Sequence, residues 1–175
     1  MNTRAKNKKI SVLELVLFAL IGAIMFVSKL VMEFLPNIHL LGALTMVSTI
    51  VFRKKALIPI YLYVFLNGLY SGFSLWWMPY LYIWTILWGI TMILPKKMPK
   101  SVQCIVYPLV CSIHGFLFGI LYAPAEAIMW GLNLDGMLAW IIAGIPFDLL
   151  HGFGNLVAGL LIVPLSDLMK RLLKR

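Results

Sequence analysis

The sequence predicts an all-α integral membrane protein with six transmembrane helices and both termini in the cytoplasm. Of its 175 residues, 62% are hydrophobic and 12% are charged, whereas soluble domains average about 45–50% and about 25%. The apolar residues form runs long enough to cross a bilayer, separated by short polar segments. We expect one membrane domain at residues 11–169, between basic tails at residues 1–10 and 170–175.

The positions of the basic residues predict the orientation. A formal net charge of +9 would suggest a nucleic-acid partner in a soluble protein. Here all of the 15 basic residues except Lys29 lie at alternate junctions between apolar runs, in residues 4–9, 53–55, 96–100 and 170–175. Cytoplasmic loops carry the excess of Lys and Arg. We therefore expect a multi-pass protein of the cell membrane with an even number of spans and no nucleic-acid partner.

Residues 11–34 form the first predicted span, which runs outward. Ser11 and Glu14 have the spacing of a capping box, in which each side chain accepts a hydrogen bond from a backbone N–H at the helix start. Small residues in a membrane helix let another helix approach closely. The cytoplasmic half of this span contains three of them, Ala19, Gly22 and Ala23.

The outer connection after this span contains candidate ligand contacts. Lys29 and Glu33 are one helical turn apart, and a solvated or mutually paired couple is the alternative. Residues 35–39 form a turn, and residues 40–52 return to the cytoplasm as a short second span. Such a span covers roughly 20 Å of a core about 30 Å thick, so the turn is expected to dip into the protein. His39 would then contact a ligand instead of lying in an interfacial loop.

Residues 56–70 form the third span, with Asn67 near its outer end, and residues 75–94 form the fourth after a turn at residues 71–74. The fourth span begins with more aromatic residues than an ordinary interfacial belt requires. Trp and Tyr favour the headgroup region, so we expect some rings to form a belt and others to offer stacking surfaces for a planar ligand. The candidates are Trp76, Trp77, Tyr80, Trp84 and, in a later loop, Trp130.

Residues 102–122 form the fifth span, with His114 near its middle. His114 should lie at a depth similar to that of the polar cluster in the last span, because each is a similar number of residues into its own span. His114 would either pack in the core or contact a ligand. Residues 123–135 are expected to form the longest outer connection, long enough to cap a pocket.

Residues 136–168 form the sixth span and contain the densest polar cluster. Asp148, His151 and Asn155 fall at i, i+3 and i+7, which is one face of a helix. Pro146, followed by Gly152 and Gly154, is typical of a broken transporter helix that a ligand or another backbone can approach. A carboxylate at this depth costs roughly 3 kcal/mol on insertion scales. We expect the three polar residues to face a ligand; the alternative is that they only hold helices together.

These features together resemble the substrate-binding S components of energy-coupling factor transporters: six spans, both ends inside, the Ala19 and Ala23 patch, outer polar and aromatic residues, and the Pro-Phe-Asp-x-x-His-x-x-x-Asn turn at residues 146–155. The resemblance implies a subunit that binds a vitamin or related micronutrient from outside and hydrolyses nothing. It implies as partners a membrane coupling subunit, which docks on Ala19 and Ala23, and a pair of cytoplasmic ATPases. Metal-ion members have a histidine after the initiator methionine, whereas Asn2 stands here, which disfavours nickel and cobalt.

Two other classes are alternatives. One is a self-contained oligomeric secondary transporter or channel, with Asp148 and His151 as a proton relay. The other is an intramembrane enzyme with His151 as its base. The sequence has no phosphate-binding loop, no zinc-protease motif and no nucleophile in an elbow context. We therefore expect no enzymatic activity, no cofactor and no bound metal.

Overall fold

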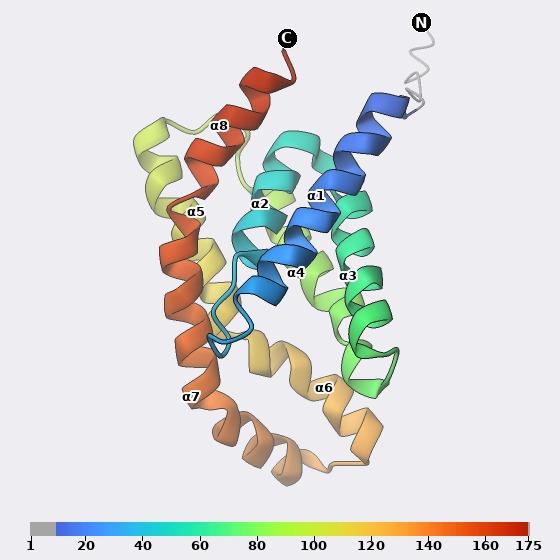
Figure 1. Ribbon diagram of the computed structural model, residues 1–175. Helices are drawn as coiled ribbons and strands as arrows, with labels where there is room; N and C mark the ends of the chain where they lie inside the picture. The colour runs from blue at the N-terminus through green and yellow to red at the C-terminus, as the bar shows by residue number, and fades with distance from the viewer. Residues whose placement is uncertain (1–9, 175) are drawn as a thin grey trace, which may run out of the picture.

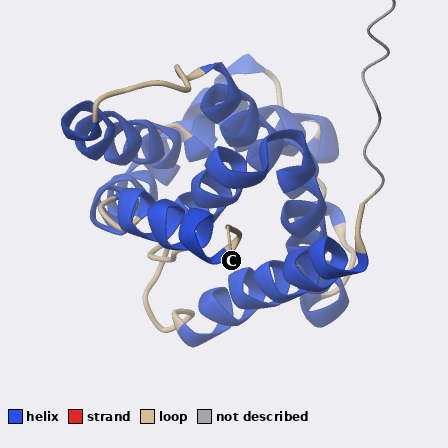
Figure 2. Ribbon diagram, turned by 90° about the horizontal axis from the view of Figure 1, so that it is seen from above, coloured by secondary structure: helices blue, strands red, loops and turns tan. Residues whose placement is uncertain are grey.

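The computed structural model describes residues 10–174, which form a helical bundle without strands in that range (Figure 1). The helices are α1 (Val12–Val31), α2 (Leu41–Phe52), α3 (Leu57–Ser71), α4 (Tyr80–Ile93), α5 (Lys100–Phe116), α6 (Phe118–Trp130), α7 (Leu134–Gly159) and α8 (Ile162–Leu172), with 3-10 turns η1 (Arg53–Ala56) and η2 (Leu75–Trp77). The start of α1 and the end of α8 lie at the same end of the bundle (Figure 1). The view from above shows helices joined by loops throughout the described chain (Figure 2).

Three helical segments are long and apolar enough to cross a membrane, namely Val12–Val31, Lys100–Trp130 and Leu134–Gly159. Many of their large apolar side chains are exposed, such as Leu20 and Ile24 on α1. A soluble protein rarely exposes continuous apolar surface on this scale, whereas a bilayer covers it. These observations support a helical membrane protein. The span count of six and the orientation of the termini stay predictions.

α2 is the central helix of the bundle. It contacts α1, α3, α4, α5, α7 and α8, and its buried residues include Leu41, Met46 and Thr49. A helix that is apolar around its whole circumference is normally buried on all sides, and Thr49 satisfies its hydroxyl by donating to the Thr45 carbonyl at 2.7 Å. The short helix predicted at residues 40–52 is therefore confirmed as α2.

α5 and α7 form a closely packed seam. A methyl group on Gly159 would lie 2.6 Å from Pro108 Cα, and one on Gly115 would lie 2.9 Å from Gly152 Cα. The Ser112 hydroxyl also donates to the Gly152 carbonyl at 2.9 Å. The close backbone approach predicted at Gly152 is thus confirmed, and the group that approaches is α5.

The capping box at the start of α1 is also confirmed. The Ser11 Oγ accepts from the Glu14 N–H at 3.2 Å, and the Glu14 carboxylate accepts from the Ser11 N–H at 3.0 Å. Gly22, in contrast, does not belong to an outer docking face. It is buried against α3, where an added methyl group would lie 2.8 Å from Leu62 Cδ2. A small residue permits close packing on either side of a helix, and spacing alone does not say which helix approaches.

Several predicted boundaries are wrong. The fifth span predicted at residues 102–122 is divided at Leu117, where α5 ends and α6 begins. The connection expected at residues 123–135 is mostly α6, and only residues 131–133 lie between α6 and α7, because alanines and other good helix formers extend the helix past Pro124. α7 continues through Pro146 without a break, since a proline removes a single helical hydrogen bond that surrounding groups can replace. The sixth span ends at Gly159, and α8 is a separate helix.

Candidate functional site

A polar cavity of about 160 Å³ lies between the α1–α2 connection and helices α3, α4, α6 and α7. The connection itself supplies much of the wall, from Met32 to His39. Phe118 at the start of α6 and Leu41 at the start of α2 add apolar surface. The polar or charged side chains in the lining include Lys29, Glu33, His39, Tyr63, Tyr80 and His151.

The three histidines of the chain gather beside this cavity. The His39 and His151 rings have centroids 4.7 Å apart, and Phe118 lies 4.7 Å from His151 and 6.2 Å from His114. Trp84 lies 6.0 Å from His39 and 5.9 Å from His114. His114 and His151 are therefore at similar depth, as predicted, and both are buried. In residues 10–174 no group of three or more His, Cys, Asp or Glu is placed to hold a metal ion.

Several buried polar atoms around the cavity have no hydrogen-bond partner within the described protein. Buried polar groups are normally hydrogen-bonded, and leaving one unsatisfied costs about 1–3 kcal/mol. His39 Nδ1, Tyr63 OH and His151 Nε2 belong to residues that line the cavity. Four more belong to neighbouring residues: His114 Nδ1, Trp84 Nε1, and both Nδ2 and Oδ1 of Asn67, which is one helical turn from Tyr63 on α3. A small polar ligand would supply the hydrogen bonds that the protein does not.

Two residues of opposite charge also lie in the wall. Lys29 is half-buried near the end of α1, and Glu33 is exposed in the connection that follows. Within residues 10–174 the ion pairs are Lys55–Glu14 and Lys100–Asp167, so Lys29 and Glu33 do not pair with each other. The self-paired arrangement considered from the sequence is therefore absent, and both charges remain beside the cavity.

Asp148 and Asn155 do not line the cavity, although they share a helix with His151. The Gly119 N–H donates to the Asp148 carboxylate, with both oxygens 3.0 Å from the nitrogen. Asp148 therefore caps the first turn of α6, whose leading N–H groups have no partner within the helix. Asn155 Nδ2 donates to the Cys111 carbonyl at 3.2 Å, across the α5–α7 seam.

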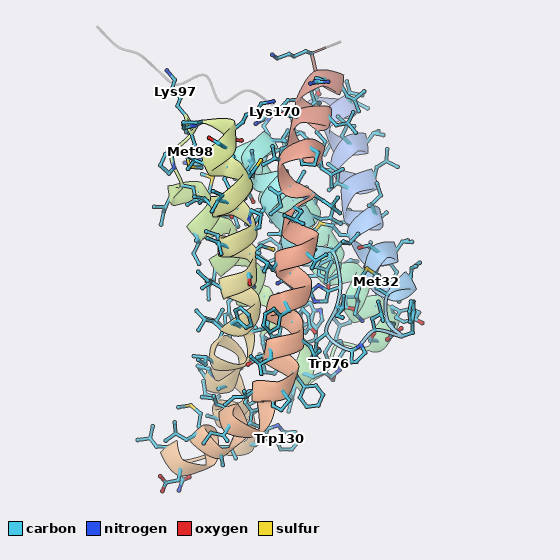
Figure 3. All side chains as sticks on the ribbon, turned by 90° about the vertical axis from the view of Figure 1, so that its left-hand side faces the viewer. Met32, Trp76, Lys97, Met98, Trp130 and Lys170 are labelled. Atoms are coloured by element: carbon cyan, nitrogen blue, oxygen red, sulfur yellow. The ribbon has the colours of Figure 1, made fainter. Side chains whose placement is uncertain are left out.

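The predicted aromatic residues divide into two groups. Trp84 is 1% exposed in the core, and Tyr80 lines the cavity. The remaining three lie elsewhere. Trp77 Nε1 donates to the Val64 carbonyl at 2.8 Å, the Trp76 carbonyl accepts from Tyr122 OH, and Trp130 is 67% exposed at the end of the bundle opposite Lys170 (Figure 3).

The cavity residues that sequence reasoning missed include Tyr63 and Phe118. Tyr63 has a signal in the sequence, because it lies four residues before Asn67 and shares its helical face. Phe118 has none, since one phenylalanine in an apolar run resembles any other. Its position depends on the turn at Leu117 that separates α5 from α6.

The outer face of α1 retains two of the predicted docking residues. Ala19 is exposed and Ala23 is half-buried. Ala23 also lines a surface groove of about 460 Å³ together with apolar residues of α1, among them Leu20, Ile24 and Val27. Small and apolar residues thus alternate along a face that the bundle leaves uncovered.

Comparisons of this chain with protein-family models, with curated proteins and with solved structures found no match.

Proposed function

We propose that the protein is the substrate-binding subunit, or S component, of an energy-coupling factor transporter. It binds a vitamin or related small micronutrient at the outer side of the cell membrane. It depends on a membrane coupling subunit and a pair of cytoplasmic ATPases for release of the substrate inside the cell. In this proposal six helical segments cross the membrane and both termini are cytoplasmic.

The observation that supports binding most directly is the set of unpartnered polar atoms around one cavity. His39 Nδ1, Tyr63 OH and His151 Nε2 come from three separate elements and belong to residues of the same wall. Structural polar groups would be expected to bond one another, as Asp148 and Gly119 do. Ligand sites commonly combine an apolar lining with a few polar groups that fix the orientation of the ligand.

The location of the cavity supports uptake from outside. Met32, which lines it, lies away from Lys97 and Lys170 along the bundle axis (Figure 3). Basic loops mark the cytoplasmic side, so the cavity lies toward the opposite side. The α1–α2 connection supplies much of the cavity wall, so movement of this segment would change access to the cavity.

The need for partners follows from size and surface. Secondary transporters commonly place a midplane site between two repeats that rock against each other, and this chain of 175 residues has no internal repeat. The exposed face of α1 with Ala19 and Ala23 suits close packing with a helix of a coupling subunit. The alternative proton relay lacks support, because Asp148 binds Gly119 and does not line the cavity with His151.

Reconstitution into liposomes tests the proposal. The protein with its ATPase module should accumulate substrate only when ATP is supplied, and it should co-purify with that module. Ala19→Trp together with Ala23→Trp should abolish this uptake and leave ligand binding intact. ATP-independent, proton-driven uptake by the protein alone would contradict the proposal and support the oligomeric secondary transporter.

A further inference from the structure

A second polar cavity lies at the other end of the bundle and has no part in the function proposed above. Its volume is about 250 Å³. Three basic side chains line it, each from a different element: Arg53 from η1, Lys96 from the α4–α5 connection and Lys170 from α8. Thr91 and Gln103 add polar groups, and Ile50 and Leu94 add apolar surface.

No acidic side chain is among the described residues that line this cavity. The chain has only six acidic residues, and two of them pair with lysines outside the lining. Glu14 binds Lys55, and Asp167 binds Lys100 at 2.6 Å. The others lie in the α1–α2 connection or on α6 and α7, namely Glu33, Glu126, Asp135 and Asp148. No carboxylate lines the cavity beside these three cations, although Asp167 on α8 interacts electrostatically with Lys170.

Arg53 is held in place at considerable local cost. Its backbone has φ +55, a conformation that costs a residue with a side chain about 1–3 kcal/mol and is concentrated at functional sites. Its Nη2 donates to the Met92 carbonyl at 2.8 Å, and its own carbonyl accepts from Trp88 Nε1 at 3.1 Å. A guanidinium has five N–H donors, so this anchored group retains donors for a ligand.

We infer that this cavity binds a phosphate-bearing anion, either the headgroup of an anionic phospholipid or a soluble phosphate. Arginine and lysine together form short, charge-assisted hydrogen bonds to phosphate oxygens. The cavity is at the level of Lys97 and Lys170, at one end of the bundle (Figure 3). Basic pockets between membrane helices at the cytoplasmic surface bind lipid headgroups in this way.

The experiment compares two double variants of the full chain in detergent. Lys96→Gln with Lys170→Gln removes two cavity charges. Lys97→Gln with Lys174→Gln removes two charges outside the lining, one from the same α4–α5 connection and one from the turn that follows α8. Each protein is titrated with phosphatidylglycerol, with phosphatidylcholine and with inorganic phosphate. Native mass spectrometry measures the bound species, and thermal unfolding measures stabilisation.

We expect phosphatidylglycerol to bind and stabilise the wild type, phosphatidylcholine to do so at least 10-fold more weakly, and the cavity variant to lose at least 10-fold in apparent affinity. The control variant should retain wild-type affinity. Binding of phosphatidylglycerol alone identifies a lipid headgroup, and competition by inorganic phosphate identifies the phosphate group itself as sufficient.

Equal losses in the two double variants would overturn the inference, because they would show attraction to the surface charge as a whole. Equal binding of the two lipids, or no binding of any of the three probes, would also overturn it. If the cavity variant unfolds, the single substitutions Lys96→Gln and Lys97→Gln replace the pair, and equal affinities would again contradict the site.

Discussion

His151 and Asn155 lie one helical turn apart on α7, but only His151 lines the cavity. Asn155 donates from Nδ2 to the Cys111 carbonyl across the α5–α7 seam, and its Oδ1 has no partner within residues 10–174. His151 faces the cavity, and its Nε2 has no partner within residues 10–174. Asp148, one turn in the other direction, binds the Gly119 N–H. One stripe of polar residues therefore includes two helix-packing groups and one cavity group.

A polar residue inside a membrane protein can either hold helices together or bind a ligand. Polar side chains at this depth are costly, and that cost falls when the protein supplies their hydrogen bonds. A side chain whose bonds are made holds helices together. One whose bonds are not made, beside a cavity, remains available to a ligand. Substitution of the first kind of side chain should lower stability, and substitution of the second kind should lower ligand affinity.

Gly159→Ala should have the largest effect, a loss of about 2–3 kcal/mol in the free energy of unfolding, which is in the range for overpacked interiors. The added methyl group would lie 2.6 Å from Pro108 Cα, so α5 and α7 would have to separate. Gly144→Ala on the same helix is the control, because a methyl group there meets no atom within 4 Å. Equal thermal stability of the two variants would show that the seam is not closely packed.

Asp148→Ala should lower the free energy of unfolding by about 1–3 kcal/mol, because the buried N–H of Gly119 loses its acceptor. Asp148→Asn retains one acceptor oxygen and should lose less. Ligand affinity should be unchanged in both, as measured on the folded protein. A selective loss of affinity with unchanged melting temperature would place Asp148 in the binding site and contradict the helix-capping role.

Tyr63→Phe should leave stability unchanged or slightly raised, because the Tyr63 hydroxyl has no partner in the described protein. Ligand affinity should fall by about 0.5–1.5 kcal/mol, or roughly 2- to 10-fold, if the ligand bonds that hydroxyl. Tyr61→Phe is the matched control on the same helix. Its hydroxyl donates to the Leu81 carbonyl at 3.0 Å, so stability should fall and affinity should stay constant. If Tyr63→Phe lowered stability and Tyr61→Phe lowered affinity, the absence of a hydrogen-bond partner would not identify a ligand-binding residue.

The smallest effect is expected at the Lys100–Asp167 pair, which joins the first residue of α5 to α8. The hydrogen bond from Lys100 lowers the pKa of Asp167 below its ordinary value of 3.8. Stability from this pair is present above that value and is lost as the pH falls through the lower folded-state pKa. Exposed pairs contribute about 0.2–1 kcal/mol and are screened by salt. Lys100→Ala should reduce the melting temperature slightly at pH 7, and this difference should vanish in strong acid; a difference that grew in acid would contradict it.

Local features were predictable from the sequence. The capping box of Ser11 and Glu14, the short α2 and the close approach at Gly152 all follow from residue type and spacing, and the structure confirms them. Where a side chain points within the bundle was not predictable. Asp148, His151 and Asn155 share a helical face, but α6, the cavity and α5 lie beside them in turn.

The remaining errors have the same origin. Gly22 and Ala19 are equally small, and only the position of Leu62 on α3 shows that Gly22 packs inside. The helical content of residues 123–130 was masked by Pro124, which suggested a loop. Spacing in one helix cannot identify the neighbours that tertiary packing brings to each side.

Native mass spectrometry of the protein purified from its host tests the central claim most directly, because a tight binder should retain its ligand. The wild type, His151→Ala and Asn155→Ala are compared after thermal unfolding has shown how much of each is folded. We predict a bound small molecule on the wild type and on folded Asn155→Ala, and its loss from His151→Ala. Retention of that molecule at wild-type occupancy by His151→Ala would contradict the assignment of the cavity as the ligand site.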